Sequence, residues 1–260
     1  MRIGFIGAGK MAEGILSAIE ERKGVVMAEK VAERAAEMSR KYGVATTGDA
    51  KVVAKKAKFF FLAVRPQDVG AVAAEVKPLL TEKHTLVSIV AGKTLTKLRK
   101  AFGAKANLVR VMPNLALRAN AGMCAICPAA KTPAKDVKLV EKILGGAGAT
   151  VVLKEKDFDA VTALSGSGPA YFAYMEEAMV EGGVKLGLKP AVARLLAEQT
   201  MYGTAKFLRE SGMDLRPFIE GVCTKGGTTA AGMEKLDDPK FKQIVAATLA
   251  AAAKRSRELA

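Results

Sequence analysis

Histidine, cysteine and tryptophan are scarce in this chain of 260 residues, which contains one histidine, three cysteines and no tryptophan. The histidine, His84, stands in a polar segment before a strand pattern, where we expect a loop residue and no general base. Cys124 and Cys127 lie in an apolar run, and at strand spacing their side chains point to opposite faces. We expect both to be buried thiols, since free cysteine behaves as a small hydrophobe. The sequence therefore predicts no metal site and a mechanism without histidine.

Long apolar runs are also missing. None approaches the roughly 18 residues that cross a bilayer, and the apolar stretch at the N-terminus is too short for a signal peptide. We expect a cytoplasmic protein with no membrane partner.

The formal net charge of +15 is large enough to suggest nucleic acid or an anionic membrane surface. The basic residues are dispersed along the chain, without an arginine-rich arm, so we expect a solvated basic surface and no nucleic-acid partner. A basic regulatory protein that binds anionic partners remains an alternative.

Strand and helix patterns alternate over the first 156 residues, which is typical of βαβ units and a parallel sheet. Strands are expected at residues 2–6, 25–28, 58–64, 85–90, 107–112, 122–127 and 150–153. Helices are expected at residues 10–21, 31–41, 67–79, 94–101 and 133–145. The run Lys58 to Val64 is continuously apolar after its lysine, as in a strand buried on both faces.

Beyond residue 156 the pattern becomes helical. Helices are expected at residues 157–186, 190–211, 215–222, 228–236 and 239–259. We therefore predict an α/β protein in which a Rossmann-type, mostly parallel sheet over residues 1–156 precedes an all-α domain over residues 157–260.

The turn Gly7-Ala8-Gly9-Lys10-Met11-Ala12 follows the first strand and opens a helix. This is the placement of the dinucleotide fingerprint G-x-G-x-x-G/A, with Ala12 at the permitted third position. Gly7 allows the tight turn, Gly9 lets the backbone approach a pyrophosphate, and amides at the helix start bind the phosphate oxygens. The turn predicts a nicotinamide dinucleotide as cofactor.

Glu29 stands 20 residues after Gly9, at the end of the second strand. An acidic residue there binds the ribose hydroxyls of NAD and repels the 2′-phosphate of NADP, so it favours NADH. Lys30 follows directly, and Arg34 lies one helical turn further on. NADPH therefore stays open as the cofactor.

Two compact segments of small residues occur in the helical part, Leu164 to Tyr171 and Thr224 to Thr229. In the second, hydroxyl groups stand beside the first amides of a helix, a combination that binds carboxylates. Lys225 adds a positive charge. Simple helix capping by both segments is an equal alternative.

The chain resembles pyrroline-5-carboxylate reductases over essentially its whole length. The resemblance is carried by Gly4 to Ala12, Ala63-Val64-Arg65-Pro66-Gln67, Leu164 to Tyr171, and Gly226-Gly227-Thr228-Thr229-Ala230-Ala231-Gly232. It implies reduction of 1-pyrroline-5-carboxylate to proline, the last step of proline biosynthesis. It also implies that residues 157–260 form the substrate-binding and dimerisation domain, with a homodimer made by the C-terminal helices that can assemble into a larger ring.

The resemblance also implies roles for individual residues. Cofactor-binding positions are Gly7 to Ala12, Ala63, Val64, Arg65, Pro66, Ala91 and Gly92. The substrate carboxylate would be held by Thr224, Gly227, Thr228 and Thr229. Apart from the resemblance, Glu29 and Lys30 are cofactor candidates from their spacing after Gly9, and we expect Thr229, or a water that it orients, to protonate the imine nitrogen.

Two related enzyme classes remain as alternatives. β-Hydroxyacid dehydrogenases use a lysine and an asparagine on the following helix, but Phe172 and Glu176 stand near those places here. A deazaflavin-linked NADP reductase fits the N-terminal half, and the turn Gly226 to Thr229 argues against it.

Overall fold

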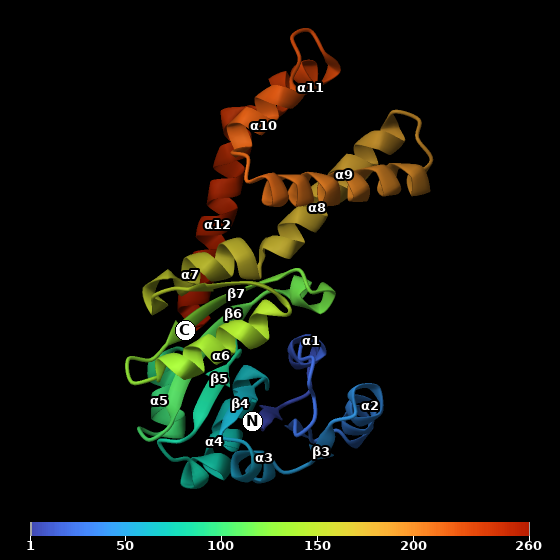
Figure 1. The fold of residues 1–260 in the computed structure, drawn as a ribbon. Coiled ribbons are helices and arrows are strands. Elements are labelled where there is room, and N and C mark those ends of the chain that lie inside the picture. The colour runs from blue at the N-terminus through green and yellow to red at the C-terminus, as the bar shows by residue number, and fades with distance from the viewer. Residues whose placement is uncertain (1, 260) are drawn as a thin grey trace. The chain divides into compact units, whose positions relative to one another are not determined.

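The computed structural model describes residues 2–259 and confirms the predicted fold class, a mostly parallel sheet followed by a helical region (Figure 1). The strands are β1 (Ile3–Ile6), β2 (Val26–Ala28), β3 (Ala45–Thr47), β4 (Phe59–Leu62), β5 (Thr85–Ser88), β6 (Asn107–Pro113), β7 (Gly122–Pro128) and β8 (Gly148–Val152). Their spatial order is β3-β2-β1-β4-β5-β6-β7-β8. Every pair is parallel except β6 with β7, which are antiparallel.

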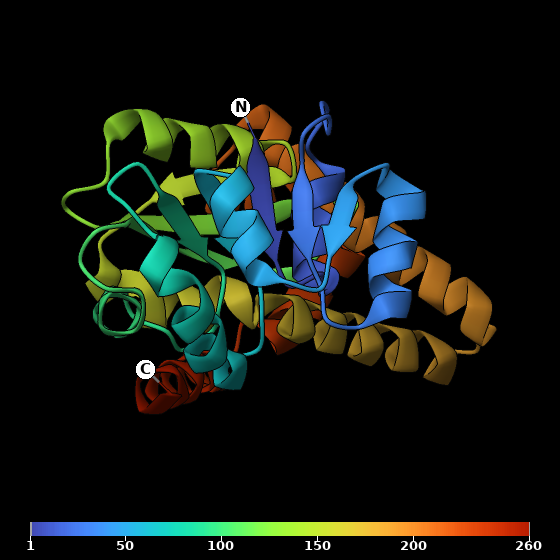
Figure 2. The same ribbon diagram turned by 90° about the horizontal axis from the view of Figure 1, so that it is seen from below.

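Helices cover both faces of this sheet (Figure 2). They are α1 (Lys10–Ser17), α2 (Ala32–Tyr42), α3 (Ala50–Lys56), α4 (Val69–Val76), α5 (Leu95–Phe102) and α6 (Ala134–Gly145). Short 3-10 turns are η1 (Pro66–Asp68), η2 (Lys77–Leu79), η3 (Leu115–Ala119) and η4 (Glu155–Asp157).

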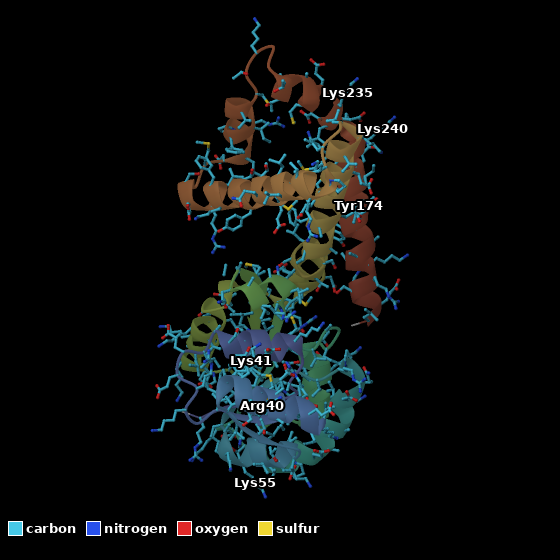
Figure 3. The ribbon with its side chains drawn as sticks, turned by 90° about the vertical axis from the view of Figure 1, so that its right-hand side faces the viewer. Arg40, Lys41, Lys55, Tyr174, Lys235 and Lys240 are labelled. Carbon is cyan, nitrogen blue, oxygen red and sulfur yellow. The ribbon has the colours of Figure 1, made fainter. Side chains whose placement is uncertain are left out.

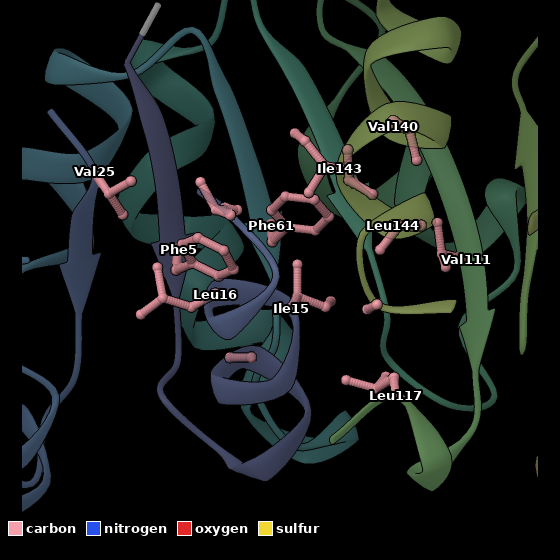
Figure 4. Close-up of a cluster of buried hydrophobic side chains, with 14 of the residues drawn as sticks. Phe5, Ile15, Leu16, Val25, Phe61, Val111, Leu117, Val140, Ile143 and Leu144 are labelled. Atoms are coloured by element: carbon pink, nitrogen blue, oxygen red, sulfur yellow. The ribbon is translucent and has the colours of Figure 1, made fainter. Parts of the chain in front are cut away.

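Strand β4 shows why the sheet needs both layers. Phe59 and Phe61 pack in the core on one face, where Phe61 stacks on Phe5 with ring centroids 5.0 Å apart (Figure 4). Phe60 and Leu62 pack in the core on the other face. Because burial of each such side chain contributes about 1.5–3 kcal/mol, this strand stabilises both layers.

The helical region begins with α7 (Phe158–Val161) and the π-helical segment η5 (Thr162–Gly166). It continues with α8 (Gly168–Lys185), α9 (Pro190–Ser211), α10 (Leu215–Val222), α11 (Thr228–Leu236) and α12 (Pro239–Leu259). The chain divides into two compact units: residues up to 167 together with those from 252 onward, and residues 168–251. The expected division into a dinucleotide-binding domain at 1–156 and a substrate-binding and dimerisation domain at 157–260 stays a prediction.

The prediction of one continuous helix over residues 157–186 is wrong, because this segment consists of α7, η5 and α8. Gly166 and Gly168 favour helix poorly, and Pro169 has no amide hydrogen with which to continue the ladder. The amide of Ser167 instead reaches back to the carbonyl of Thr162 at 2.9 Å. This wide turn ends one helix before the next begins.

Strand β3 and helix α3 were not expected from the sequence. Strand β3 has three residues, of which one is exposed and two are half-buried, so it lacks an apolar signature. Helix α3 begins after Asp49, whose carboxylate accepts a hydrogen bond from the Lys51 amide at 2.8 Å. An aspartate N-cap is therefore the signal that could have located α3.

His84 lies in the turn just before β5, as expected, but unlike most loop residues it is fully buried. Its Nδ1 accepts from the Thr81 amide at 2.9 Å, so Nε2 carries the proton and donates to the Ala54 carbonyl at 3.0 Å. Burial lowers the pKa of the imidazole. The residue ties β5 to the end of α3.

Cys124 and Cys127 are buried on β7 and pack in different core clusters, as expected for opposite faces. Burial raises the pKa of the Cys124 thiol to about 11 and also raises that of Cys127. Both thiols are therefore protonated at neutral pH.

Candidate functional site

A pocket of about 420 Å³ lies at the carboxyl ends of β1, β2 and β4, where ligands bind in open parallel sheets. Its lining residues are Ile6, Gly7, Ala8, Gly9, Ala28, Glu29, Lys30, Val31, Gly48, Ala50, Ala63, Val64, Arg65, Asp68, Ala71 and Val72. The structure thus gathers the first three residues of the Gly-rich turn, Glu29, Lys30 and the segment Ala63 to Arg65 around one cavity.

The two glycines of the turn meet different surroundings. Gly7 has a φ of +96°, and a Cβ there would lie 2.5 Å from the Ala63 carbonyl oxygen. Gly9 precedes α1 as its N-cap, with φ −64° and ψ 173°, and a Cβ there would meet no atom within 4 Å. Gly7 therefore permits the fold of the turn, whereas Gly9 leaves open space where the backbone faces the pocket.

This space fits a dinucleotide pyrophosphate. No side chain caps the start of α1, so its first amides can bind phosphate oxygens. The small side chains Ala8, Ala63 and Val64 let a ligand lie close to the sheet edge. The Gly9 amide and the first amides of α1 would hold the phosphates, because the amides of Gly7 and Ala8 already donate to the Ala28 carbonyl and to Glu29. The apolar residues would receive the flat rings.

Glu29 is positioned by two backbone amides. Its Oε2 accepts from the Ala8 amide at 2.8 Å, and its Oε1 accepts from the Val31 amide at 3.0 Å. A carboxylate offers about four lone-pair sites, so two remain for ribose hydroxyls. Glu29 can bind a ribose while it also braces the Gly-rich turn.

The two basic residues near Glu29, Lys30 and Arg34, differ in how many protein groups they contact. Lys30 lines the pocket, is 70% exposed and stands 3.6 Å from Glu75. Arg34 donates from Nε to the Ala8 carbonyl at 2.8 Å and from its terminal nitrogens to Glu13 and Glu37. The guanidinium is therefore engaged within the protein, outside the pocket lining.

Several expected cofactor positions do not line the pocket. Lys10, Met11 and Ala12 form the first turn of α1, with Ala12 fully buried. Pro66 follows the lining residue Arg65 at the start of η1. Their expected contact with a cofactor stays a prediction.

The turn at Ala91 and Gly92 also lies outside the pocket lining. Gly92 has a φ of +69°, and a Cβ there would lie 2.9 Å from the Leu259 carbonyl oxygen, so the end of α12 approaches this turn. Nearby, the Ser256 hydroxyl contacts Asp159 Oδ1 at 2.7 Å. These contacts hold the C-terminal turn of α12 within the first unit.

Sequence reasoning missed the part of the pocket that Gly48, Ala50, Asp68, Ala71 and Val72 form. Gly48 lies between β3 and α3, and Ala50 is the first residue of α3; neither element was expected. The other three residues lie on η1 and α4. The Asp49 N-cap was the available signal for the first pair.

The second candidate turn lies in the other unit, before α11. Gly226 has a φ of +72°, and the Gly227 amide donates to the Thr224 carbonyl at 2.9 Å. A Cβ at Gly227 would lie 2.5 Å from Thr224 Oγ1, so only glycine lets this hydroxyl approach the helix start. No side chain caps α11. The first amides of α11, at Thr228 and Thr229, stand at its positive end.

Within the described residues 2–259, no three histidine, cysteine or acidic side chains gather as metal ligands. Nor does any helix of this part combine the length and apolar character needed to cross a membrane.

Sequence and structure comparisons divide the chain at the same region where the pattern changes. Residues 155–259 match the family model for pyrroline-5-carboxylate reductase dimerisation, and residues 2–92 match that for coenzyme F420-dependent NADP oxidoreductases. Pyrroline-5-carboxylate reductase from Pisum sativum is 35% identical over 99% of this chain and 95% of its own length.

Solved structures agree over the whole length. A pyrroline-5-carboxylate reductase from Coxiella burnetii has a TM-score of 0.96 at 29% identity, covering 100% of this chain and 98% of its own. That of Plasmodium falciparum pyrroline carboxylate reductase with NADP bound has a TM-score of 0.86 at 28% identity, with the same coverage. On these full-length relationships, the chain belongs to the pyrroline-5-carboxylate reductase family.

Proposed function

We propose that this protein is an NAD(P)H-dependent reductase that converts 1-pyrroline-5-carboxylate to proline. The observation that carries the proposal is the full-length relationship to pyrroline-5-carboxylate reductases, at 35% identity over 95% of the Pisum sativum enzyme. The dinucleotide pocket supports it, because the reaction requires a hydride donor.

The match of residues 2–92 to F420-dependent oxidoreductases does not favour a deazaflavin enzyme. Those residues contain the Gly-rich turn and Glu29, which serve dinucleotides in many reductases. Residues 155–259, which match the dimerisation model of the imine reductases, are specific to the proposed reaction.

The substrate carboxylate is proposed to bind at the start of α11. Thr224, Thr228 and Thr229 offer hydroxyls, and the amides of Thr228 and Thr229 offer hydrogen bonds that the helix dipole strengthens, while Gly227 keeps the turn open. Lys225, next to these residues, adds a positive charge. Together these groups match a single carboxylate on a small ring.

Little acid–base machinery is needed for this reaction. A bound reduced nicotinamide supplies the hydride, so the chain has to orient the imine and protonate its nitrogen. Holding the reactants in attack geometry contributes about 7–11 kcal/mol in favourable cases. Thr229, or a water that it orients, is the proposed proton donor.

NADH is the proposed preferred cofactor, on the evidence of Glu29. Its carboxylate lines the pocket and keeps lone pairs for ribose hydroxyls, and it would repel a 2′-phosphate. The NADP in the Plasmodium falciparum structure leaves NADPH as the second candidate. Steady-state kcat/KM with each cofactor decides: a ratio in favour of NADPH contradicts the role given to Glu29.

A homodimer through the C-terminal helices is proposed, with assembly into a larger ring as a further possibility. Large apolar side chains are exposed on α8 and α9, among them Phe172, Tyr174 (Figure 3), Leu195 and Tyr202. Burying such a face contributes favourably in proportion to its area. Light scattering at several concentrations measures the assembly. A cytoplasmic location stays a prediction.

The role of Thr229 can be tested by Thr229→Ala. We expect kcat/KM for the imine to fall by about tenfold or more, since a positioned proton donor commonly contributes at least that much. The Kd for NADH should stay within about twofold, a change of only a few tenths of a kcal/mol. Thr248→Ala, on α12, is a control, because that hydroxyl donates to the Ile244 carbonyl of its own helix. Loss of NADH binding in Thr229→Ala would contradict the assignment.

A further inference from the structure

Both backbone polar groups of Ala8, in the Gly-rich turn, are hydrogen-bonded to side chains. The Ala8 amide donates to Glu29 Oε2 at 2.8 Å, and Arg34 Nε donates to the Ala8 carbonyl at 2.8 Å. Ala8 lines the dinucleotide pocket. The residue expected to select the ribose and the nearby arginine therefore both brace the turn that would hold the phosphates.

All three nitrogens of the Arg34 guanidinium donate within the protein. Besides the contact from Nε to Ala8, one terminal nitrogen contacts Glu13 Oε2 at 2.6 Å and the other contacts Glu37 Oε2 at 2.7 Å. The Glu37 side chain is 49% exposed, whereas that of Glu13 is 10% exposed. Since exposed ion pairs contribute little, Glu13 is the stronger anchor.

Glu13 is itself fixed by a cluster of side chains from α2. Its Oε1 accepts from Lys41 Nζ at 2.7 Å and from the Tyr42 hydroxyl at 3.0 Å. Hydrogen bonds from Lys41 and Arg34 hold the pKa of this carboxyl at about 2, so it is ionised at neutral pH. Figure 3 labels Lys41 on α2. Because loss of any of these partners would leave a nearly buried charge less well compensated, the carboxylate is held in this position.

We infer that Glu13 is a positioning residue that sets cofactor choice, because it keeps the Arg34 guanidinium on the Ala8 carbonyl and withholds it from a 2′-phosphate. The inference deepens the proposed function and rests on its dinucleotide site. Arg34 stands one helical turn after Lys30 and Val31, which both line the pocket. Arginine would be the stronger ligand for a 2′-phosphate, since its planar fork binds two phosphate oxygens at once.

Two consequences separate this reading from the usual one. Where an arginine binds the 2′-phosphate, removing it weakens NADPH binding and spares NADH. Here Arg34 serves the turn that both cofactors share, so Arg34→Gln should weaken NADH and NADPH alike. Glu13→Gln removes the charge that holds Arg34 and should strengthen NADPH relative to NADH by about five- to tenfold, or about 1–1.4 kcal/mol.

The test measures the Kd of NADH and of NADPH by calorimetry, with the full chain and without imine. The variants are Glu13→Gln, Arg34→Gln, the double variant, and Glu33→Gln as a control that removes one negative charge from an exposed position on α2. We expect the ratio of the two Kd values to shift in Glu13→Gln, to stay within about twofold in the control, and to return to the original value in the double variant.

An unchanged ratio in a folded Glu13→Gln overturns the inference, as does a selective loss of NADPH binding in Arg34→Gln. Thermal unfolding shows whether Glu13→Gln folds. If it does not, Arg34→Gln decides alone, because equal and unequal losses have opposite meanings. Binding is measured without imine, so a failure of the proposed reductase activity would appear separately, in turnover assays of the unmodified protein.

Discussion

Gly9→Ala adds one methyl group to the dinucleotide turn at a place where the folded chain has room for it. The backbone there has φ −64° and ψ 173°, and the new Cβ would meet no atom within 4 Å. Alanine is a poorer N-cap than glycine, which lowers the stability of the fold by up to about 1 kcal/mol. Alanine also reduces the conformational entropy of the unfolded chain, which raises the stability by about 0.4–1 kcal/mol. These effects oppose each other, so the free energy of unfolding should change by less than about 0.5 kcal/mol.

Cofactor binding should respond differently. The methyl group would occupy the space through which a pyrophosphate reaches the amides at the start of α1. We expect the Kd for NADH to rise by about tenfold or more, which corresponds to about 1.4 kcal/mol. Gly9→Ala is thus expected to be a stable protein that binds its cofactor poorly.

Gly7→Ala is the matched opposite. At a φ of +96° an alanine is strained by about 1–2 kcal/mol. Its Cβ, 2.5 Å from the Ala63 carbonyl oxygen, would force a shift that costs about 1–3 kcal/mol more. The sum of about 2–5 kcal/mol is a large part of the 5–15 kcal/mol by which domains are usually stable.

Urea unfolding and calorimetric titration with NADH, applied to both variants, test the reasoning. The expected result is a stability loss in Gly7→Ala and a binding loss without a stability loss in Gly9→Ala. If Gly9→Ala bound NADH like the unmodified protein, the backbone at Gly9 would not be the surface that a pyrophosphate approaches. If Gly7→Ala were as stable as Gly9→Ala, the contact with Ala63 would be wrong.

Two further predictions concern ion pairs. The pKa of Glu13 falls from 4.5 to about 2 on folding. A lowered pKa contributes stability above pH 4.5 that is lost as the pH falls towards 2, on the order of 2 kcal/mol. Urea unfolding should therefore show that Glu13→Gln loses less stability between pH 7 and pH 3 than the unmodified protein does. Glu155→Gln should cost about 2–3 kcal/mol in urea unfolding, because Arg110, 7% exposed and 2.9 Å from Glu155, would lose its charged partner. Glu258→Gln, at an exposed pair with Arg255, should change stability by less than about 0.5 kcal/mol, and an equal loss would contradict this ranking.

The core strands were predictable from the sequence because their residues carry the whole signal. The run Phe59–Leu62 is apolar on both faces and is buried on both, although β4 is shorter than the expected 58–64. Strands β6 and β7 lie within a residue of their expected ranges. Strand β3 was not predictable in this way. Its stability comes from pairing with β2, and none of its three residues is buried. Edge strands of this kind depend on a partner that local patterns do not reveal.

The candidate site divides in the same manner. The turn could be predicted from its two glycines. Gly7 is required by its positive φ, and Gly9 by the open space beside its backbone. The residues Gly48 and Ala50 have no such signature, and they reach the pocket only because α3 is folded there. Spacing along the chain locates the Gly-rich turn, whereas the part of the pocket that Gly48 and Ala50 form depends on tertiary packing.

Glu29 shows the limit of a motif as a statement about specificity. The spacing from Gly9 predicts that Glu29 is a ribose ligand, and its carboxylate also accepts a hydrogen bond from the Ala8 amide and so braces the turn. Arg34, which a sequence pattern offers as a phosphate ligand, is held by Glu13, a residue that no cofactor motif contains. We therefore expect cofactor preference in this protein to depend on the network of Glu13, Glu29 and Arg34 around the Ala8 backbone, because a charged residue acts on the cofactor only to the extent that its other partners release it.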